Sequence, residues 1–203
     1  MRKLRTGLTL AIAAATLAGL ASPALADDPT WTVTPGGQAT GTATNVTLKD
    51  VKTGSTLTCA SSTAQATVQS GSGLSGTGIA TVTSSSYTSC TGPLGLSFSV
   101  NTGTVNYQLN AASYANGVTT GTLSGITASM SGLFCSASVA GTSASTAGTV
   151  NGTYTNSTAT LSVTGGDLHV WNVSGCFGLI NSGDAVSITA NYAMSPGQTI
   201  TSP

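Results

Sequence analysis

The stretch AVSITANYAM at residues 185–194 alternates apolar and polar side chains. Val186 and Ile188 share one face of an extended chain, whereas Ser187 and Thr189 share the other. This period of two is typical of an antiparallel strand with one buried face. Runs of the same kind recur, and the sequence predicts about ten short strands at residues 45–51, 55–60, 78–84, 96–100, 105–109, 121–130, 148–156, 159–164, 167–173 and 185–194.

The rest of the composition favours the same fold class. Residues that stabilise helices are scarce, and glycine and β-branched residues recur every few positions, which lowers helix stability at nearly every turn. Turn dipeptides separate several of the runs, at Asn116-Gly117, Gly165-Gly166 and Pro196-Gly197. We therefore expect an all-β fold, either an antiparallel β-sandwich or a small β-barrel.

The first residues have the pattern of a secretory signal peptide. A basic start is followed by the apolar run at residues 8–20 and by the small-residue site Ala24-Leu25-Ala26. A membrane-spanning helix needs about 20 apolar residues, and this run is shorter. We expect residues 1–26 to be removed and residues 27–203 to form a single extracellular domain. Whether this domain consists of two related halves stays open.

Few charges remain after this cleavage. Residues 27–203 contain two lysines, five aspartates and no arginine or glutamate, a formal charge of −3 with neutral histidine. The chain lacks a basic patch, which attraction to nucleic acid or to anionic lipid requires. We expect no nucleic-acid partner and no membrane insertion, whereas the oligomeric state stays open.

The four cysteines, Cys59, Cys90, Cys135 and Cys176, predict two disulfides in an exported chain. Their spacing contains no C-x-x-C pair, so a zinc site is disfavoured. In each half of the chain one cysteine ends a strand and the next opens a glycine-containing corner. If the halves are related, each half closes on itself, which pairs Cys59 with Cys90 and Cys135 with Cys176.

Several short segments of the sequence resemble those of a family of small secreted actinobacterial proteins. They are WTVTPGG, GSTLTCASS, SCTGPLGLSF, GVTTGTLSGI, YTNSTATLSV, NVSGCFGLINSGD and SPGQTI, which span nearly the whole of residues 31–200. The resemblance implies secretion and a single domain, and it assigns no site residue. Secreted actinobacterial carriers of enediynes share the Thr/Ser/Gly/Ala-rich character and two disulfides, although their cysteine spacing differs.

The segment at residues 167–184 gathers the residue types of nucleophile and base pairs, namely Asp167, His169, Ser174, Cys176 and Asp184. A serine hydrolase would use His169, the one histidine, as its base, but no G-x-S-x-G elbow occurs. We interpret His169 as an edge residue beside a half-buried tryptophan, and Asp167 and Asp184 as turn aspartates. No catalytic residue, cofactor ligand or metal ligand is assigned.

The same segment predicts a disulfide corner. A strand at residues 168–173 ends at Gly175, and Cys176 is bridged. Gly178 and Gly183 then permit a tight return into the strand at 185–194.

The function that these observations favour is a non-enzymatic binding module for a small apolar ligand or a surface glycan. Four tyrosines are candidates for exposed sugar-stacking faces: Tyr107, Tyr114, Tyr154 and Tyr192. The alternatives are a structural protein of the cell surface, with a sheet edge that pairs with another chain, and an extracellular hydrolase that uses His169.

Overall fold

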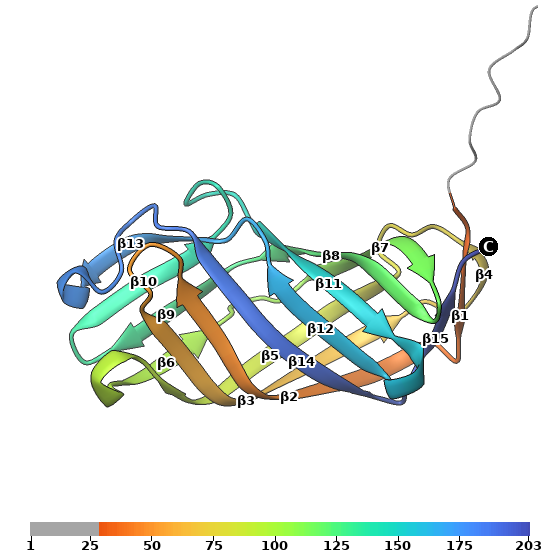
Figure 1. The fold of residues 1–203 in the computed structure, drawn as a ribbon, viewed down its shortest axis with the longest axis horizontal. Coiled ribbons are helices and arrows are strands. Elements are labelled where there is room, and N and C mark those ends of the chain that lie inside the picture. Colours follow the sequence, from red (N-terminus) through yellow and green to blue (C-terminus); the bar gives the residue numbers. More distant parts are fainter. Residues whose placement is uncertain (1–28) are drawn as a thin grey trace, which may run out of the picture.

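The computed structural model describes residues 29–203, which are mostly antiparallel strands (Figure 1). The expected signal peptide, residues 1–26, lies outside the described residues. The strands are β1 (Trp31–Thr34), β2 (Gly37–Asp50), β3 (Thr56–Val68), β4 (Gly71–Leu74), β5 (Ala80–Thr91), β6 (Ser97–Asn101), β7 (Tyr107–Ala115), β8 (Val118–Ile126), β9 (Ala128–Gly132), β10 (Cys135–Ala140), β11 (Gly148–Thr155), β12 (Thr160–Gly165), β13 (His169–Gly175), β14 (Val186–Ser195) and β15 (Thr199–Thr201). Three short 3-10 turns join some of them, η1 (Pro93–Gly95), η2 (Asn156–Thr158) and η3 (Cys176–Gly178).

Eight strands close into a barrel. The order around the ring is β2, β3, β5, β7, β8, β11, β12 and β14, so neighbours in the ring follow one another along the chain. The pairing of β14 with β2 closes the ring, with Val186 opposite Asp50. The ring is therefore an up-and-down barrel, and of the two expected architectures the barrel is the one observed.

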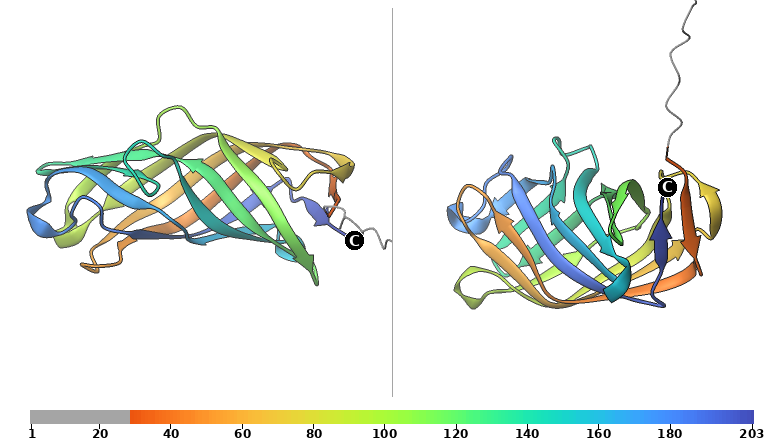
Figure 2. Two further views of the ribbon diagram at one scale, coloured as in Figure 1. Left: turned by 90° about the horizontal axis from the view of Figure 1, so that it is seen from above. Right: turned by 45° about the vertical axis from the view of Figure 1, so that its right-hand side comes forward.

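Four further strands lengthen the barrel wall at one end. The sheet continues from β5 through β6, β9 and β10 to β13, and each of these lies next in sequence to a ring strand. β13 reaches the start of β14 through a bridge between His169 and Ala185 and through a backbone hydrogen bond from Val186 to Leu168 (2.9 Å). The result is one long, narrow barrel, as the other two views show (Figure 2).

Side-chain alternation separates the barrel interior from its surface. In β14, Val186, Ala190 and Tyr192 are buried, whereas Thr189 and Asn191 are exposed. Successive side chains of a strand point to opposite faces, so apolar residues fill the bore and hydroxyls and amides cover the outside. The alternation predicted at residues 185–194 is confirmed, and its apolar face is the barrel interior.

A small second sheet lies across one end of the barrel, which we call the capped end. β1 pairs with β15 and with β4, on the right in Figure 1. Trp31 and Val33 of β1 are 1% and 0% exposed. Hydrogen bonds tie this cap to the barrel, because the Tyr154 hydroxyl donates to the Gln198 carbonyl (2.9 Å).

The opposite end, which we call the disulfide end, consists of four turns at residues 51–55, 92–96, 133–134 and 176–185. One disulfide joins Cys59 to Cys90 on neighbouring strands, and the other joins Cys135 to Cys176. The conditional pairing drawn from the sequence is confirmed.

The predicted disulfide corner is also observed. β13 ends at Gly175, the bridged Cys176 opens η3, and the chain returns into β14. Gly178 and Gly183 have φ angles of 77° and 89°, in the left-handed region that favours glycine.

The described residues form more strands than expected, fifteen against about ten. The run predicted at residues 121–130 is divided between β8 and β9, and the loop at 141–147 separates β10 from β11. The cap strands β1, β4 and β15 are only three or four residues long, although β1 does alternate, with Trp31 and Val33 buried and Thr32 and Thr34 exposed. Of the five additional strands, one comes from the division of the run at 121–130, three are β1, β4 and β15 of the cap, and the last is β10, where the sequence predicts no strand.

Candidate ligand-binding site

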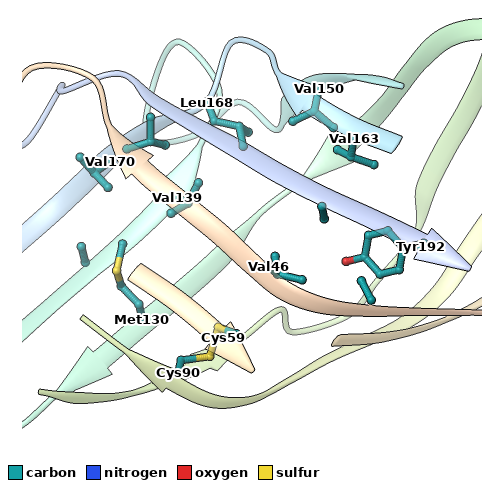
Figure 3. Close-up of a cluster of buried hydrophobic side chains, with 14 residues drawn as sticks. Val46, Cys59, Cys90, Met130, Val139, Val150, Val163, Leu168, Val170 and Tyr192 are labelled. Carbon is teal, nitrogen blue, oxygen red and sulfur yellow. A yellow bond between two sulfur atoms is a disulfide. The ribbon is translucent and has the colours of Figure 1, made fainter. Parts of the chain in front are cut away.

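The bore of the barrel contains two neighbouring cavities of about 100 Å³ each. The cavity nearer the disulfide end, which we call the lower compartment, is lined by apolar and tyrosine side chains from all eight ring strands. Figure 3 shows part of this wall, where Val46, Val139, Val150 and Val163 come from four different strands. The compartment exists because these side chains are short, so a ring of valine does not fill a barrel of this width.

The second cavity, the upper compartment, lies toward the cap. Its wall includes Ala64, Ala66 and Ala80, whose side chains are a single methyl group. Ile200 and Gln198, at the cap, complete the lining. Neither compartment has a charged residue in its lining.

Three tyrosines divide the two compartments. Tyr87, Tyr107 and Tyr192 line both cavities, and we call them the tyrosine waist. The Tyr192 hydroxyl lies 3.0 Å from the Ser62 hydroxyl, and the Tyr107 hydroxyl donates to the Thr127 carbonyl (3.1 Å). The waist therefore places hydrogen-bonding groups in the middle of an apolar bore.

The buried hydroxyls of the bore are held neutral. Burial, reinforced by the neighbouring Tyr87, raises the pKa of Tyr107 to about 12. The same two causes raise the pKa of Tyr192 further. Burial also raises the pKa of Tyr154, because removing a phenolate from water is costly.

The expectation that tyrosines form exposed sugar-stacking faces is wrong for three of the four. Tyr107, Tyr154 and Tyr192 are 5%, 7% and 8% exposed, and Tyr114 is half-buried. The sequence did carry a signal for this burial. Tyr192 has the same phase in its strand as Val186 and therefore shares its inward face.

A third, smaller cavity of about 40 Å³ lies between the lower compartment and the disulfide end. It shares Leu48, Leu57 and Met130 with the lower compartment and reaches the turns at 92–96 and 176–185. Apolar wall therefore runs from the tyrosine waist to the turns of this end.

Buried carboxylates flank that small cavity. Asp50 accepts the backbone N–H groups of Lys52 (2.9 Å) and Thr53 (2.8 Å), which shapes the turn after β2. Asp184 accepts the side-chain and backbone N–H of Asn181 and lies 3.4 Å from the Lys52 ammonium. The Asn181 amide is the largest cause that lowers the pKa of Asp184, although burial partly opposes it, and the Lys52 charge adds to it.

The residues considered for catalysis do not form a triad. The His169 Nδ1 lies 2.9 Å from the Asp167 carbonyl oxygen, and its ring centroid is 6.1 Å from that of Trp171. The Asp167 carboxylate instead accepts the backbone N–H of Thr149 (2.6 Å). Leu168 and Val170, on the other face of this strand, are buried in the bore, so the side on which His169 lies is the outer one.

Two searches of the described residues concern other kinds of site. Among residues 29–203, no group of three or more His, Cys, Asp and Glu side chains is placed to hold a metal ion. In the same residues, no helix has the length and apolarity needed to cross a membrane.

Comparisons with protein-family models, with curated proteins and with solved structures found no match to this chain.

Proposed function

We propose that the protein is a secreted binding protein that holds a small, neutral, apolar ligand in the bore of its barrel. The observation that carries this proposal is the pair of cavities lined by apolar side chains and the tyrosine waist, with no charged residue. Ligand pockets in barrels combine apolar walls with a few polar groups that fix orientation. The four cysteines in two disulfides suit an oxidising, extracellular compartment.

The size and polarity of the bore limit the class of ligand. Each compartment, at about 100 Å³, is somewhat smaller than the ~150 Å³ apolar cavity that holds benzene. A short branched chain fits one compartment, whereas a ring system extends past the tyrosine waist and occupies both. A charged group would have no counter-charge in either lining, so it would be expelled from the bore.

The waist adds a preference for a single polar atom. The Tyr192 hydroxyl lies 3.0 Å from the Ser62 hydroxyl and its side chain lines both compartments, so when Ser62 donates to Tyr192, the Tyr192 O–H is free to donate to a ligand carbonyl or hydroxyl. We expect an aromatic or terpenoid-like ligand with one such group to bind more tightly than the parent hydrocarbon. The alternative of a surface glycan loses support, because three of the four proposed stacking tyrosines face the bore.

A titration with the neutral fluorescent probe N-phenyl-1-naphthylamine tests the proposal. Wild-type protein should enhance its emission with saturation at one site per chain. Val163→Phe should weaken binding at least tenfold, because Val163 faces both compartments and a larger ring would occupy the cavity.

The neighbouring Thr164 supplies a matched control. It is exposed on the outer face of the same strand, so Thr164→Phe adds the same ring outside the bore. Equal weakening by both variants, or no saturable binding by wild type, would overturn the proposal. If wild type binds the probe and only Val163→Phe weakens binding, native mass spectrometry of protein from its own host can identify the natural ligand.

A further inference from the structure

Exposed large apolar side chains gather at one end of the barrel. Among the described residues the exposed large hydrophobics are Val51, Leu94, Leu133, Phe134 and Phe177. The exposed fraction of each residue lies between 61% and 90%. They lie in the four turns of the disulfide end, and each turn carries at least one. We call these five residues the apolar tips. In Figure 1 these turns lie toward the left, opposite the cap.

The apolar tips surround the end of the bore that the cap does not cover. The small cavity behind them reaches the turns at 92–96 and 176–185 and shares wall residues with the lower compartment. A ligand that enters between the turns would therefore meet mostly apolar surface, with Asp50, Ser55 and Thr56 as polar groups beside the small cavity. This arrangement matters only if the bore binds a ligand, so the inference rests on the proposed function.

The charges of this end select among possible occupants. Lys49 and Lys52 are the lysines of the described residues, and both are exposed beside the turn that carries Val51. The carboxylates nearby, Asp50 and Asp184, are only 2% and 6% exposed. Lys52 pairs with the Asp184 carboxylate (3.4 Å), whereas the exposed Lys49 has no ion pair within residues 29–203. This end thus presents the Lys49 ammonium outward beside apolar tips, which complements a surface with anionic headgroups over an apolar interior.

The shape of the surface favours a fluid occupant. The tips stand on four separate turns rather than forming one continuous apolar face. A rigid protein partner would have to supply a matching pocket for each tip, whereas a lipid interface accommodates all of them without complementary shape. The capped end has no such tips: within residues 29–203, none of its turns carries an exposed large hydrophobic residue.

We infer that the disulfide end docks on an anionic lipid surface, with the apolar tips inserted at the headgroup level, and that the ligand passes between that surface and the bore. This differs from the absence of membrane contact expected from the composition. The sequence contains too few basic residues for a patch, but the fold collects both lysines and all five apolar tips at one end.

Flotation with phospholipid vesicles tests the inference. Vesicles of phosphatidylcholine and phosphatidylglycerol (in a ratio of about 7:3) should carry wild-type protein upward through a density gradient. The triple variant Leu133→Ser, Phe134→Ser, Phe177→Ser should reduce partitioning at least tenfold, because each lost side chain removes buried apolar area. Lys49→Gln should reduce it about fivefold on these vesicles and leave binding to pure phosphatidylcholine unchanged.

A matched control lies at the other end. Ala112→Ser and Ala115→Ser alter exposed positions of β7 near the capped end and should leave flotation unchanged. Light scattering of the same samples reports the main alternative, a second copy on the tips. A dimer that the triple variant dissolves, without flotation of wild type, would overturn the inference, and so would flotation that the triple variant retains.

The outcomes separate this inference from the proposed function. Probe binding without vesicles should be the same in wild type and in the triple variant, because the tips do not line the bore. If the probe binds but the protein does not float, lipid docking is wrong and the ligand proposal stands. If the protein floats but no probe enters, the ligand proposal is wrong and the docking surface stands.

Discussion

The two ends of the barrel are stabilised in different ways. At the capped end, Trp31 and Val33 of the small sheet are buried. Tyr154 donates to the Gln198 carbonyl, and Asn156 donates to the Ile200 carbonyl and accepts its N–H, which holds the last strand in place. At the disulfide end, Phe177 and Leu94 are exposed, and covalent bridges hold the turns. An end closed by apolar packing becomes part of the core, whereas an end held by disulfides keeps its shape with its apolar side chains free.

This difference teaches that stability and function are divided along the barrel axis. Packing at the capped end raises the free energy of unfolding, but it leaves no large apolar side chain exposed there among the described residues. The disulfide end contributes through loop closure and keeps its large apolar side chains exposed. Changes at the two ends should therefore affect different measurements.

The largest effect is expected at the cap. Trp31→Ala removes a side chain that is 1% exposed and should lower the free energy of unfolding by about 3–5 kcal/mol. Phe177→Ser, at the opposite end, should change it by no more than about 0.5 kcal/mol, because that ring is 82% exposed. Urea unfolding followed by tryptophan fluorescence and circular dichroism measures both, and equal losses would break the comparison.

The second effect concerns the bridge of the disulfide end. Replacing Cys135 and Cys176 together with serine should cost about 3.5–4 kcal/mol, as loop entropy for a separation of 41 residues indicates. Hydrogen exchange should show faster opening of β10 and β13 while β1 and β15 keep their protection. Uniformly faster exchange along the barrel would argue against independent ends.

The third effect is a loss of stability at alkaline pH, and it concerns the tyrosines of the bore between the two ends. The unfolded tyrosines ionise near pH 10, but the raised pKa of Tyr107, about 12, keeps its hydroxyl neutral in the fold. Above pH 10 the unfolded state therefore releases protons that the folded state retains, and stability falls by up to about 1.4 kcal/mol per pH unit for each such tyrosine until the folded pKa is reached.

Spectrophotometric titration at alkaline pH measures this effect. Absorbance of phenolate from Tyr107 and Tyr192 should appear only together with unfolding. Tyr107→Phe should make the loss of stability above pH 10 less steep. Reversible ionisation of every tyrosine near pH 10 in folded protein would show that water fills the bore.

The smallest effect is acidic and local to the disulfide end. The pKa of Asp184 is lowered by the Asn181 amide and by Lys52, so its contribution is present above the ordinary carboxyl pKa and is lost as the pH falls through the lowered value. We expect a slight loss of stability below about pH 4 that Asp184→Asn abolishes. Thermal unfolding between pH 2 and pH 6 measures it, with Asp167→Asn as the control.

Part of this fold could be predicted because barrel strands carry a local signal. The alternation around Val186 indicated both the strand and its buried face. Tyr192 shares that phase, so its burial could have been predicted from the same signal, although we expected an exposed ring. The outer position of His169 followed from the buried phase of Leu168 and Val170. Each of these depends only on neighbours along one strand.

The remaining features depend on pairing between distant strands. Whether alternating strands form a sandwich or a barrel is decided by the pairing of β14 with β2, more than a hundred residues apart. The cavity exists because several short side chains from different strands face one another. The sequence of a single strand does not show which side chains lie opposite it. Val51, Leu94 and Phe177 likewise meet at one end only because the ring order brings their turns together.

Methyl NMR of the protein with a bound neutral aromatic ligand, such as naphthalene, tests the central claim most directly. We predict intermolecular nuclear Overhauser effects from the ligand to methyl groups of Val46, Leu123 and Val163, which line the bore. Effects confined to the exposed methyl groups of Val51, Leu94 and Leu133, with none inside the barrel, would contradict the account.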